Sequence, residues 1–222
     1  MKMTRPFSRP FSRWFAARRA APARRWLVVD VETTGLDPQA DELLAIAAVA
    51  VDVSDPRRPA VLLHDSIEIL LRPAERPGPP DRANVLLHGI GIGVQRAAAE
   101  PAVGLAEWNR FVDGAPLAGF HVDFDRAVIE RAQRRAGLPT TAGPWLDLSP
   151  LAAVLHPEVS GHALDDWLAH FGIRCLQRHR AAADALATAE LLLRLWPALA
   201  RQGGPMDFDQ LCRLAAQRRW LG

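Results

Sequence analysis

Residues 26–35 read W-L-V-V-D-V-E-T-T-G and predict the strand around which the rest of the chain is arranged. The apolar run 26–29 is typical of a buried central strand, and it leads directly to two carboxylates, Asp30 and Glu32. Because side chains alternate across a strand, the two acids project to one face and Val31 projects to the other. The sequence therefore predicts two acids in one small patch at the end of a buried strand.

This pair of acids indicates a site for a divalent cation. Carboxylates this close repel one another unless a cation lies between them, and Mg²⁺ and Mn²⁺ prefer oxygen ligands. The following Thr33, Thr34 and Gly35 add hydroxyls, backbone N–H groups and a flexible turn, which suit a phosphate or a nucleotide end. Taken alone, the pair also fits two solvated acids in a turn.

Composition indicates one globular domain with extensions. At 222 residues the chain can bury a sizeable core, and its 49% hydrophobic content is ordinary. Its apolar runs are much shorter than the roughly 18 residues of a membrane-spanning helix, so no membrane span is predicted. Cys175 and Cys212 have neither metal-ligand spacing nor a disulfide framework around them, so we expect free or buried thiols in a reducing compartment and no zinc site.

Positive charge is concentrated at the start of the chain. Residues 1–25 hold Lys2 and seven arginines without an acid, which leaves 19 basic and 25 acidic residues in 26–222. A protein that binds nucleic acid normally presents a basic face. We therefore expect that face in residues 1–25 or in one local patch of an otherwise acidic body.

Residues 1–25 are predicted to form a basic, disordered extension. Phe7, Phe11, Trp14 and Phe15 would nevertheless align on one face of a helix. A basic amphipathic helix binds a membrane surface, a protein partner or a nucleic-acid backbone. The composition also fits a mitochondrial presequence, an alternative to a cytoplasmic bacterial protein, and the role of this segment stays open.

Residues 26–202 are predicted to form one α/β domain, with a C-terminal helix in 203–222. Strand-like runs come first and then alternate with helical patterns, which favours a mixed sheet of about five strands flanked by helices. The predicted strands are 26–29, 43–53, 61–71, 116–120 and 144–148. The predicted helices are 102–112, 124–136, 150–155, 162–171, 180–199 and 207–220, with a proline-rich loop at 73–82.

Three more acids lie at positions where they could join a site with Asp30 and Glu32. Asp123 and Asp125 lie where a predicted strand meets a helix, a position at which open α/β sheets bind ligands, although both would also serve as helix-capping or first-turn residues. Asp184 stands among small alanines, preceded by His179. Because five residues turn a helix through roughly 500°, His179 must lie on the loop before the helix if the two act together.

Three motifs together resemble the DEDDh 3′–5′ exonuclease family. They are D-x-E-T-T-G-L at 30–36, G-x-x-V-x-F-D at 119–125 and H-R-A-x-x-D-A-x-A-T at 179–188, in the family's order and spacing. The family includes the proofreading epsilon subunit of bacterial DNA polymerase III, ribonuclease T and oligoribonuclease. The resemblance extends over residues 26–200 and implies a ribonuclease-H-like fold.

The resemblance implies a role for each matching residue. Asp30, Glu32, Asp125 and Asp184 would bind two Mg²⁺ or Mn²⁺ ions, and His179 would be the general base. The sister subgroup has a tyrosine in place of this histidine, and the chain contains no tyrosine. The implied substrate-binding residues are Thr33, Thr34, Gly35, Leu36, His88 and Phe124.

Two positions depart from the family pattern. His121 stands where the family usually has Asn, and Gly91 stands where Thr often follows the H-G-I of 88–90. The first bears on contacts near Asp125, and the second on a loop that in relatives approaches the terminal nucleotide. Neither departure removes a metal ligand or the base.

Four further histidines stand outside these motifs. They lie on predicted surface loops or helices without acids at ligand spacing, and we interpret them as structural: His64, His156, His162 and His170.

The predicted activity is removal of nucleoside 5′-monophosphates from the 3′ end of a nucleic acid, with DNA favoured. RNA or short oligonucleotides are alternative substrates, because a 2′-OH contact depends on pocket geometry. A non-catalytic nucleic-acid-binding module is the other alternative, and the complete set of four acids and a histidine argues against it. Because only 203–222 follow the domain, we expect a stand-alone or differently partnered exonuclease. A homo-oligomer is compatible with the sequence, but the sequence does not determine the oligomeric state.

Overall fold

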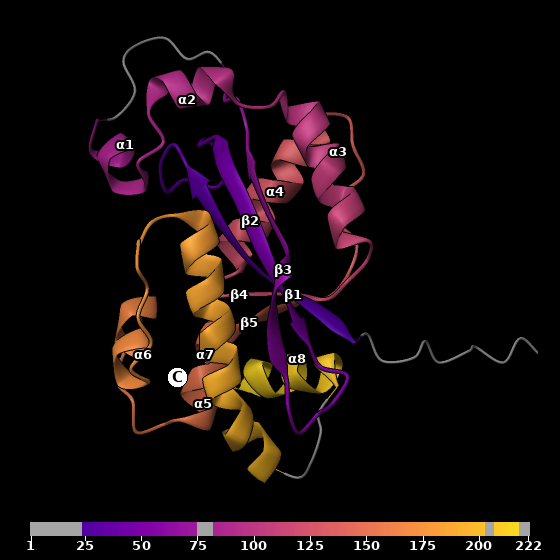
Figure 1. Ribbon diagram of the computed structural model, residues 1–222, viewed down its shortest axis with the longest axis vertical. Helices are drawn as coiled ribbons and strands as arrows, with labels where there is room; N and C mark the ends of the chain where they lie inside the picture. The colour runs from indigo at the N-terminus through magenta and orange to yellow at the C-terminus, as the bar shows by residue number, and fades with distance from the viewer. Residues whose placement is uncertain (1–23, 75–81, 203–206, 218–222) are drawn as a thin grey trace, which may run out of the picture.

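The computed structural model describes residues 24–74, 82–202 and 207–217, and within them one five-stranded sheet carries helices on both faces (Figure 1). The strand order is β3-β2-β1-β4-β5, antiparallel among the first three strands and parallel from β1 through β4 to β5. The strands are β1 Arg25–Thr33, β2 Leu43–Asp52, β3 Ala60–Leu70, β4 Leu117–Gly119 and β5 Trp145–Asp147. This mixed sheet confirms the predicted architecture.

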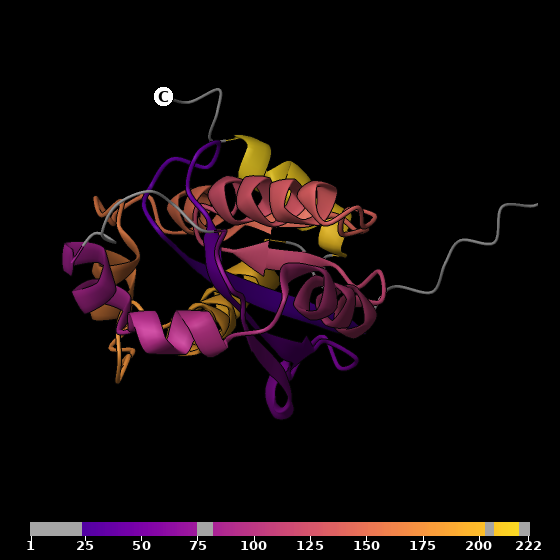
Figure 2. The ribbon, with the colours of Figure 1, turned by 90° about the horizontal axis from the view of Figure 1, so that it is seen from above.

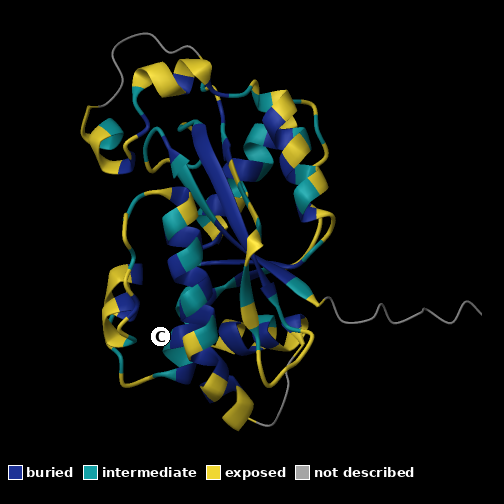
Figure 3. Ribbon diagram, viewed as in Figure 1, coloured by how far each residue is buried: buried dark blue, intermediate teal, exposed yellow. Residues whose placement is uncertain are grey.

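Helices cover both faces of the sheet, and α7 runs along β1 and β2 (Figures 1 and 2). One face is covered by α5 Leu148–Leu155, α6 Leu164–His170, α7 Ala181–Arg201 and α8 Phe208–Ala216. The other face is covered by α3 Pro101–Val112 and α4 Asp123–Arg135. Two short helices, α1 Arg82–His88 and α2 Ile92–Ala97, lie near the end of β1 and are largely exposed, whereas the central strands are buried (Figure 3).

The central strand β1 is buried on both of its faces. Trp26 and Val28 pack into the core beneath α5, α7 and α8, whereas Leu27 and Val29 pack into the core beneath α3 and α4. These four side chains are at most 3% exposed. A strand covered on both faces needs a continuous apolar run rather than alternation, which is why residues 26–29 predict it correctly.

The sheet begins one residue earlier than predicted, because Arg25, the last residue of the predicted extension 1–25, is part of β1. Arg25 begins β1, and its guanidinium binds the Asp65 carboxylate through Nε (2.6 Å) and Nη2 (2.7 Å). The same group donates to the carbonyl of Phe111 and lies 4.6 Å from the centre of that ring. Arg25 is therefore a structural residue of the domain, while the predicted disorder and apolar face of 1–23 lie outside the described residues.

The sequence did not predict α1 and α2, and it assigned Arg82 to a loop. These helices have only seven and six residues, too few to display an amphipathic period, and Gly93 lowers the helix propensity of α2. Tertiary contacts support them instead. Ile90, between the two helices, lies in one buried cluster with residues of β2 and with Ala181 of α7, and the buried Gln95 amide donates to the Ile90 carbonyl. The segment is therefore held by packing rather than by its own pattern.

Other boundaries differ from prediction by a few residues. α5 begins at Leu148 because Asp147 caps it, accepting the backbone N–H of Ser149 at 2.9 Å. α7 continues beyond Pro197 to Arg201. α8 ends at Ala216, and the predicted continuation to 218–220 lies outside the described residues. Among the helices of the described residues, none combines the length and apolar character needed to cross a membrane.

A buried amide joins α3 to α4, and its loss should be costly. Gln133 is 0% exposed; its Nε2 donates to Asn109 and Thr141, and its Oε1 accepts the backbone N–H of Thr141. Gln133→Leu should lower the free energy of unfolding by about 2–4 kcal/mol, because buried polar groups lose their partners. Urea denaturation measures this change. The matched surface variant Gln39→Leu should shift stability by less than about 0.5 kcal/mol, and equal effects would contradict the assigned role.

Candidate functional site

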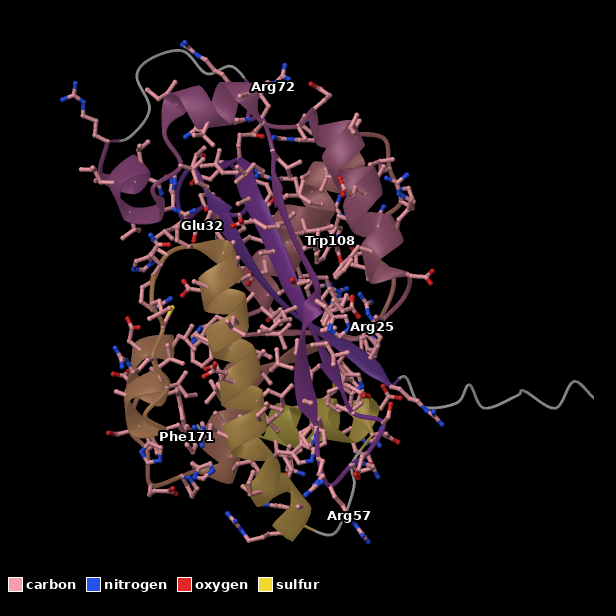
Figure 4. All side chains as sticks on the ribbon, viewed as in Figure 1. Arg25, Glu32, Arg57, Arg72, Trp108 and Phe171 are labelled. Atoms are coloured by element: carbon pink, nitrogen blue, oxygen red, sulfur yellow. The ribbon has the colours of Figure 1, made fainter. Side chains whose placement is uncertain are left out.

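Three acids from distant parts of the sequence meet beside the end of β1. Asp30, Glu32 and Asp184 each contribute one carboxylate oxygen, and these three oxygens lie within 4.8 Å of one another. Asp30 and Glu32 share a face of β1, as their spacing predicts, and Asp184 enters from the first turn of α7. Figure 4 shows Glu32 between α1 and the start of α7.

Asp125 approaches the same patch from the first turn of α4. It is 6% exposed, and its carboxylate accepts the backbone N–H of Val31, the residue between the two acids of β1. Its negative charge acts on Asp30. Asp123, by contrast, is exposed to solvent. The structure thus brings Asp125 rather than Asp123 to the acids of β1.

Burial and mutual repulsion make the charged state of this cluster unfavourable. Burial, followed by the charges of Asp125, Asp184 and Glu32, raises the pKa of Asp30 well above its ordinary value. Burial is also the main cause that raises the pKa of Asp125. Burial and then the charge of Asp184 raise the pKa of Glu32 to about 7. A bound cation would reverse these shifts, because it stabilises the ionised carboxylates.

His179 lies on the loop before α7, as its spacing from Asp184 predicts. Its backbone N–H donates to Oδ2 of Asp184 at 2.9 Å, and its φ of 62° is in the left-handed region. This conformation is uncommon for a residue with a side chain and persists where surrounding contacts hold it. The hydrogen bond therefore fixes the histidine directly beside an acid of the cluster.

Arg178 and Cys175 contact the cluster, although neither was predicted to be a site residue. The Arg178 guanidinium bridges Asp165 of α6, with Nε 2.5 Å from its carboxylate, and Asp184 of α7. Its positive charge opposes the rise in the pKa of Asp30 and of Glu32. The Cys175 thiol lies 3.4 Å from Oδ1 of Asp184. The one available sequence signal was the adjacency of Arg178 to His179.

The loop after β1 uses its threonines internally. Thr33 Oγ1 donates to the carbonyl of Gly35, and Thr34 Oγ1 bonds to the Asp41 carboxylate and accepts the backbone N–H of Glu42. A Cβ on Gly35 would lie only 2.4 Å from an oxygen of Asp41, so a side chain there would displace the carboxylate that bonds to Thr34. These residues shape the loop beside the acids, and the next side chain, Leu36, is 89% exposed.

His88, which the sequence predicts to bind substrate, is a buried residue at the end of α1. The ring is 1% exposed; Nε2 bonds to Asn84 Oδ1 at 2.7 Å, and Nδ1 accepts the backbone N–H of Ile90 at 2.9 Å. Both nitrogens are therefore engaged in shaping the turn, and burial lowers the pKa of the ring. Gly89 has a φ of 70°, and a Cβ there would lie 3.9 Å from Arg180 Nη1, which places this loop beside the start of α7.

Phe124, which was also predicted to bind substrate, is half-buried and packs against the core beneath α3 and α4. Of the four histidines interpreted as structural, two lie close to each other and to one acid. His156 and His170 each offer a nitrogen within 4.8 Å of a Glu158 oxygen and of one another. The sequence missed this group because the tertiary structure brings His170 back to residues 156–158.

Comparison with known proteins places the chain in a family. The exonuclease (RNase T) family model matches residues 27–192, which include all the motif residues above. The chain belongs to this family. It is 35% identical over 181 residues to a DNA polymerase III subunit epsilon-like protein of Rhodobacter capsulatus, covering 80% of the chain and 24% of the relative.

One more curated relative and one solved structure also resemble the chain. A PolC-type DNA polymerase III of Latilactobacillus sakei is 28% identical over 196 residues, covering 84% of the chain and 12% of the relative. The chain thus spans a quarter or less of the length of these curated relatives. The fold resembles that of E. coli exonuclease I in complex with a dA16 oligonucleotide, with a TM-score of 0.63, 23% identity, and coverage of 79% of this chain and 42% of that chain.

The acid cluster should make stability depend on pH and on divalent ions. Its donors are carboxylate oxygens, which fit Mg²⁺ and Mn²⁺. Between the ordinary pKa of 4.5 and the folded value of about 7, Glu32 holds a proton that the unfolded chain releases. In EDTA, stability should therefore increase as the pH falls through this window.

Excess Mg²⁺ should raise the melting temperature at neutral pH and flatten this dependence. Differential scanning fluorimetry across the pH window, with EDTA or Mg²⁺, measures both effects. Glu32→Gln should weaken the pH dependence, whereas the exposed control Glu107→Gln should leave it unchanged. A pH profile insensitive to Mg²⁺ would contradict a cation site at these acids.

Proposed function

We propose that this protein is a metal-dependent 3′–5′ exonuclease that releases nucleoside 5′-monophosphates from the 3′ end of DNA. The observation that carries the proposal is the meeting of Asp30, Glu32 and Asp184 within 4.8 Å, with the backbone N–H of His179 donating to Asp184. A purely binding module gains nothing from buried acids facing a phosphate, since they repel it. Membership in an exonuclease family supports the same conclusion.

Four acids are proposed to hold two ions, with Asp30, Glu32 and Asp184 at one and Asp30 and Asp125 near the other. When bound, the ions supply positive charge to the phosphate and lower the pKa of the attacking water. His179 takes the proton of that water, whose oxygen forms the new bond to phosphorus. The bond from phosphorus to the 3′ oxygen of the preceding nucleotide breaks, and that oxygen is protonated from solvent.

Residues around the acids would position the strand. Arg180 is exposed, lies beside the loop at Gly89, and acts electrostatically on Glu32, so its guanidinium is suited to a phosphate of the terminal nucleotides. Leu36 and Leu176 are each 89% exposed and offer apolar surfaces to unpaired bases. The preference for DNA rests on the names of the relatives, which include DNA polymerase III proteins and an exonuclease I bound to dA16.

Three of the finer predictions stay proposals. The choice of Mg²⁺ or Mn²⁺ follows from the oxygen donors, which suit both ions. Docking of a protein partner through residues 1–25 is proposed from their basic, aromatic composition. A cytoplasmic bacterial location is proposed from the bacterial relatives, with the mitochondrial alternative tied to the same segment.

The substrate class is tested with matched 3′-labelled single strands of DNA and RNA of one sequence. Wild-type protein with Mg²⁺ should release labelled deoxynucleoside 5′-monophosphate faster than the ribonucleotide, and EDTA should abolish release. Asp184→Asn, purified identically, controls for contaminating nucleases. Faster release from RNA would show that RNA is the preferred substrate. Full activity in EDTA would overturn the metal-dependent mechanism.

Substitution of His179 should separate proton transfer from metal binding. General-base catalysis contributes about 10²–10⁴-fold, so His179→Ala should lower kcat by that factor. The stabilisation by Mg²⁺ should remain, whereas Asp184→Asn should lose both activity and most of that stabilisation. Single-turnover kinetics with thermal shifts measures the two properties, and the exposed His64→Ala is the matched control. Near-wild-type kcat in His179→Ala would remove this residue from the mechanism.

A further inference from the structure

A second group of ligand atoms lies apart from the four acids. His156 caps the C-terminal end of α5, Glu158 follows in the loop, and His170 is the last residue of α6. One atom from each of the three side chains lies within 4.8 Å of the others. Figure 4 marks the neighbouring Phe171 well away from Glu32, so this group is separate from the acid cluster.

We propose that His156, Glu158 and His170 form a binding site for Zn²⁺ or a chemically similar ion such as Co²⁺. Two imidazoles and one carboxylate, with a water as fourth ligand, suit these ions, whereas Mg²⁺ and Mn²⁺ prefer oxygen donors. The four-acid cluster and this group therefore select different classes of metal. The spacing of the cysteines led us to expect no zinc site, whereas the ligands proposed here are two histidines and a glutamate.

The spacing of the donors suits a tetrahedral ion after small rotations. Zinc bonds of about 2.0–2.1 Å hold neighbouring ligand atoms about 3.3 Å apart. His156 Nδ1 lies 2.9 Å from Glu158 Oε1, and the full group lies within 4.8 Å, so these separations bracket the required value. Glu158 and His170 are exposed, and the two imidazole rings are inclined at 59°.

Packing holds the remaining ligand, His156, in place before any ion binds. The His156 side chain is only 15% exposed and lies perpendicular to the Phe171 ring, with centroids 5.1 Å apart. Its Nδ1 is thereby directed at Glu158. Its Nε2 is buried without a hydrogen-bond partner among the described residues, so no outer acceptor strengthens the ligand. Such outer partners contribute about 10–100-fold to affinity, so we expect micromolar rather than nanomolar binding.

An ion here would tie the end of α5 to the end of α6. α6 also carries Asp165, whose carboxylate binds Arg178 next to the loop of His179. Binding should therefore stabilise the segment 156–170 and slow amide hydrogen exchange within it. This effect is structural and does not depend on the proposed nuclease reaction.

The test is a titration of the full chain with Zn²⁺, or with Co²⁺ for its absorption spectrum, in excess Mg²⁺ to occupy the acid cluster. Isothermal calorimetry should give one ion per chain at this site with a micromolar Kd, accompanied by a higher melting temperature. His170→Gln and Glu158→Gln should each weaken binding by at least about tenfold. Both positions are exposed, so both variants should fold.

Two controls make the outcome decisive. The exposed His64→Gln should bind Zn²⁺ as the wild type does, and Asp184→Asn should also retain this site because Asp184 supplies none of its three ligands. Unchanged zinc affinity in both ligand variants, or equal loss in His64→Gln, would overturn the proposal. Retained zinc binding in an inactive Asp184→Asn would support it independently of the nuclease function.

Discussion

Burial of neighbouring carboxylates, together with their mutual repulsion, is the constraint to which much of this structure responds. Asp30 and Asp125 are held in surroundings that raise the pKa of each well above its ordinary value. A fold does not keep such groups for stability, because uncompensated charges in a poorly solvated site are costly. The protein offsets the cost only partly, through the backbone N–H of Val31 and the nearby guanidinium of Arg178. A bound divalent cation would offset the remainder.

The scaffold allows this because β1 combines two roles along its length. Its first half packs into cores on both faces, and its second half carries the acids beside Ala45 and Ala47 of β2, which are their register partners. Both alanines are 1% exposed and lie in one buried cluster with Ile90 and Ala181, so this part of β1 is held by packing. A rigid strand therefore fixes two of the acids, while α4 and α7 each add one from a first turn.

Loops complete the site through backbone geometry rather than through exposed functional groups. His179 has a positive φ and is secured by Asp184, and Gly35 permits the close approach of Asp41. His88 uses both ring nitrogens to shape the turn that faces Arg180. Much of what a motif preserves here is thus the shape of a loop, and only some of its residues are free to contact substrate.

Sequence alone determined the sheet, most of the helices and the set of acids. Continuous apolar runs, period-two spacing and helix-end residues are local signals, and they were sufficient for β1 and for the shared face of Asp30 and Glu32. They did not predict α1 and α2, whose six or seven residues gain their order from packing.

Tertiary structure decided the contacts between residues far apart in the chain. Only the folded chain brings Arg178 between Asp165 and Asp184, assigns both nitrogens of His88 to a turn, and returns His170 to Glu158. The physical reason is that period and propensity describe neighbours along one element. The ion pairs, the pKa shifts and the metal-ligand distances depend on how separate elements pack, which local patterns do not encode.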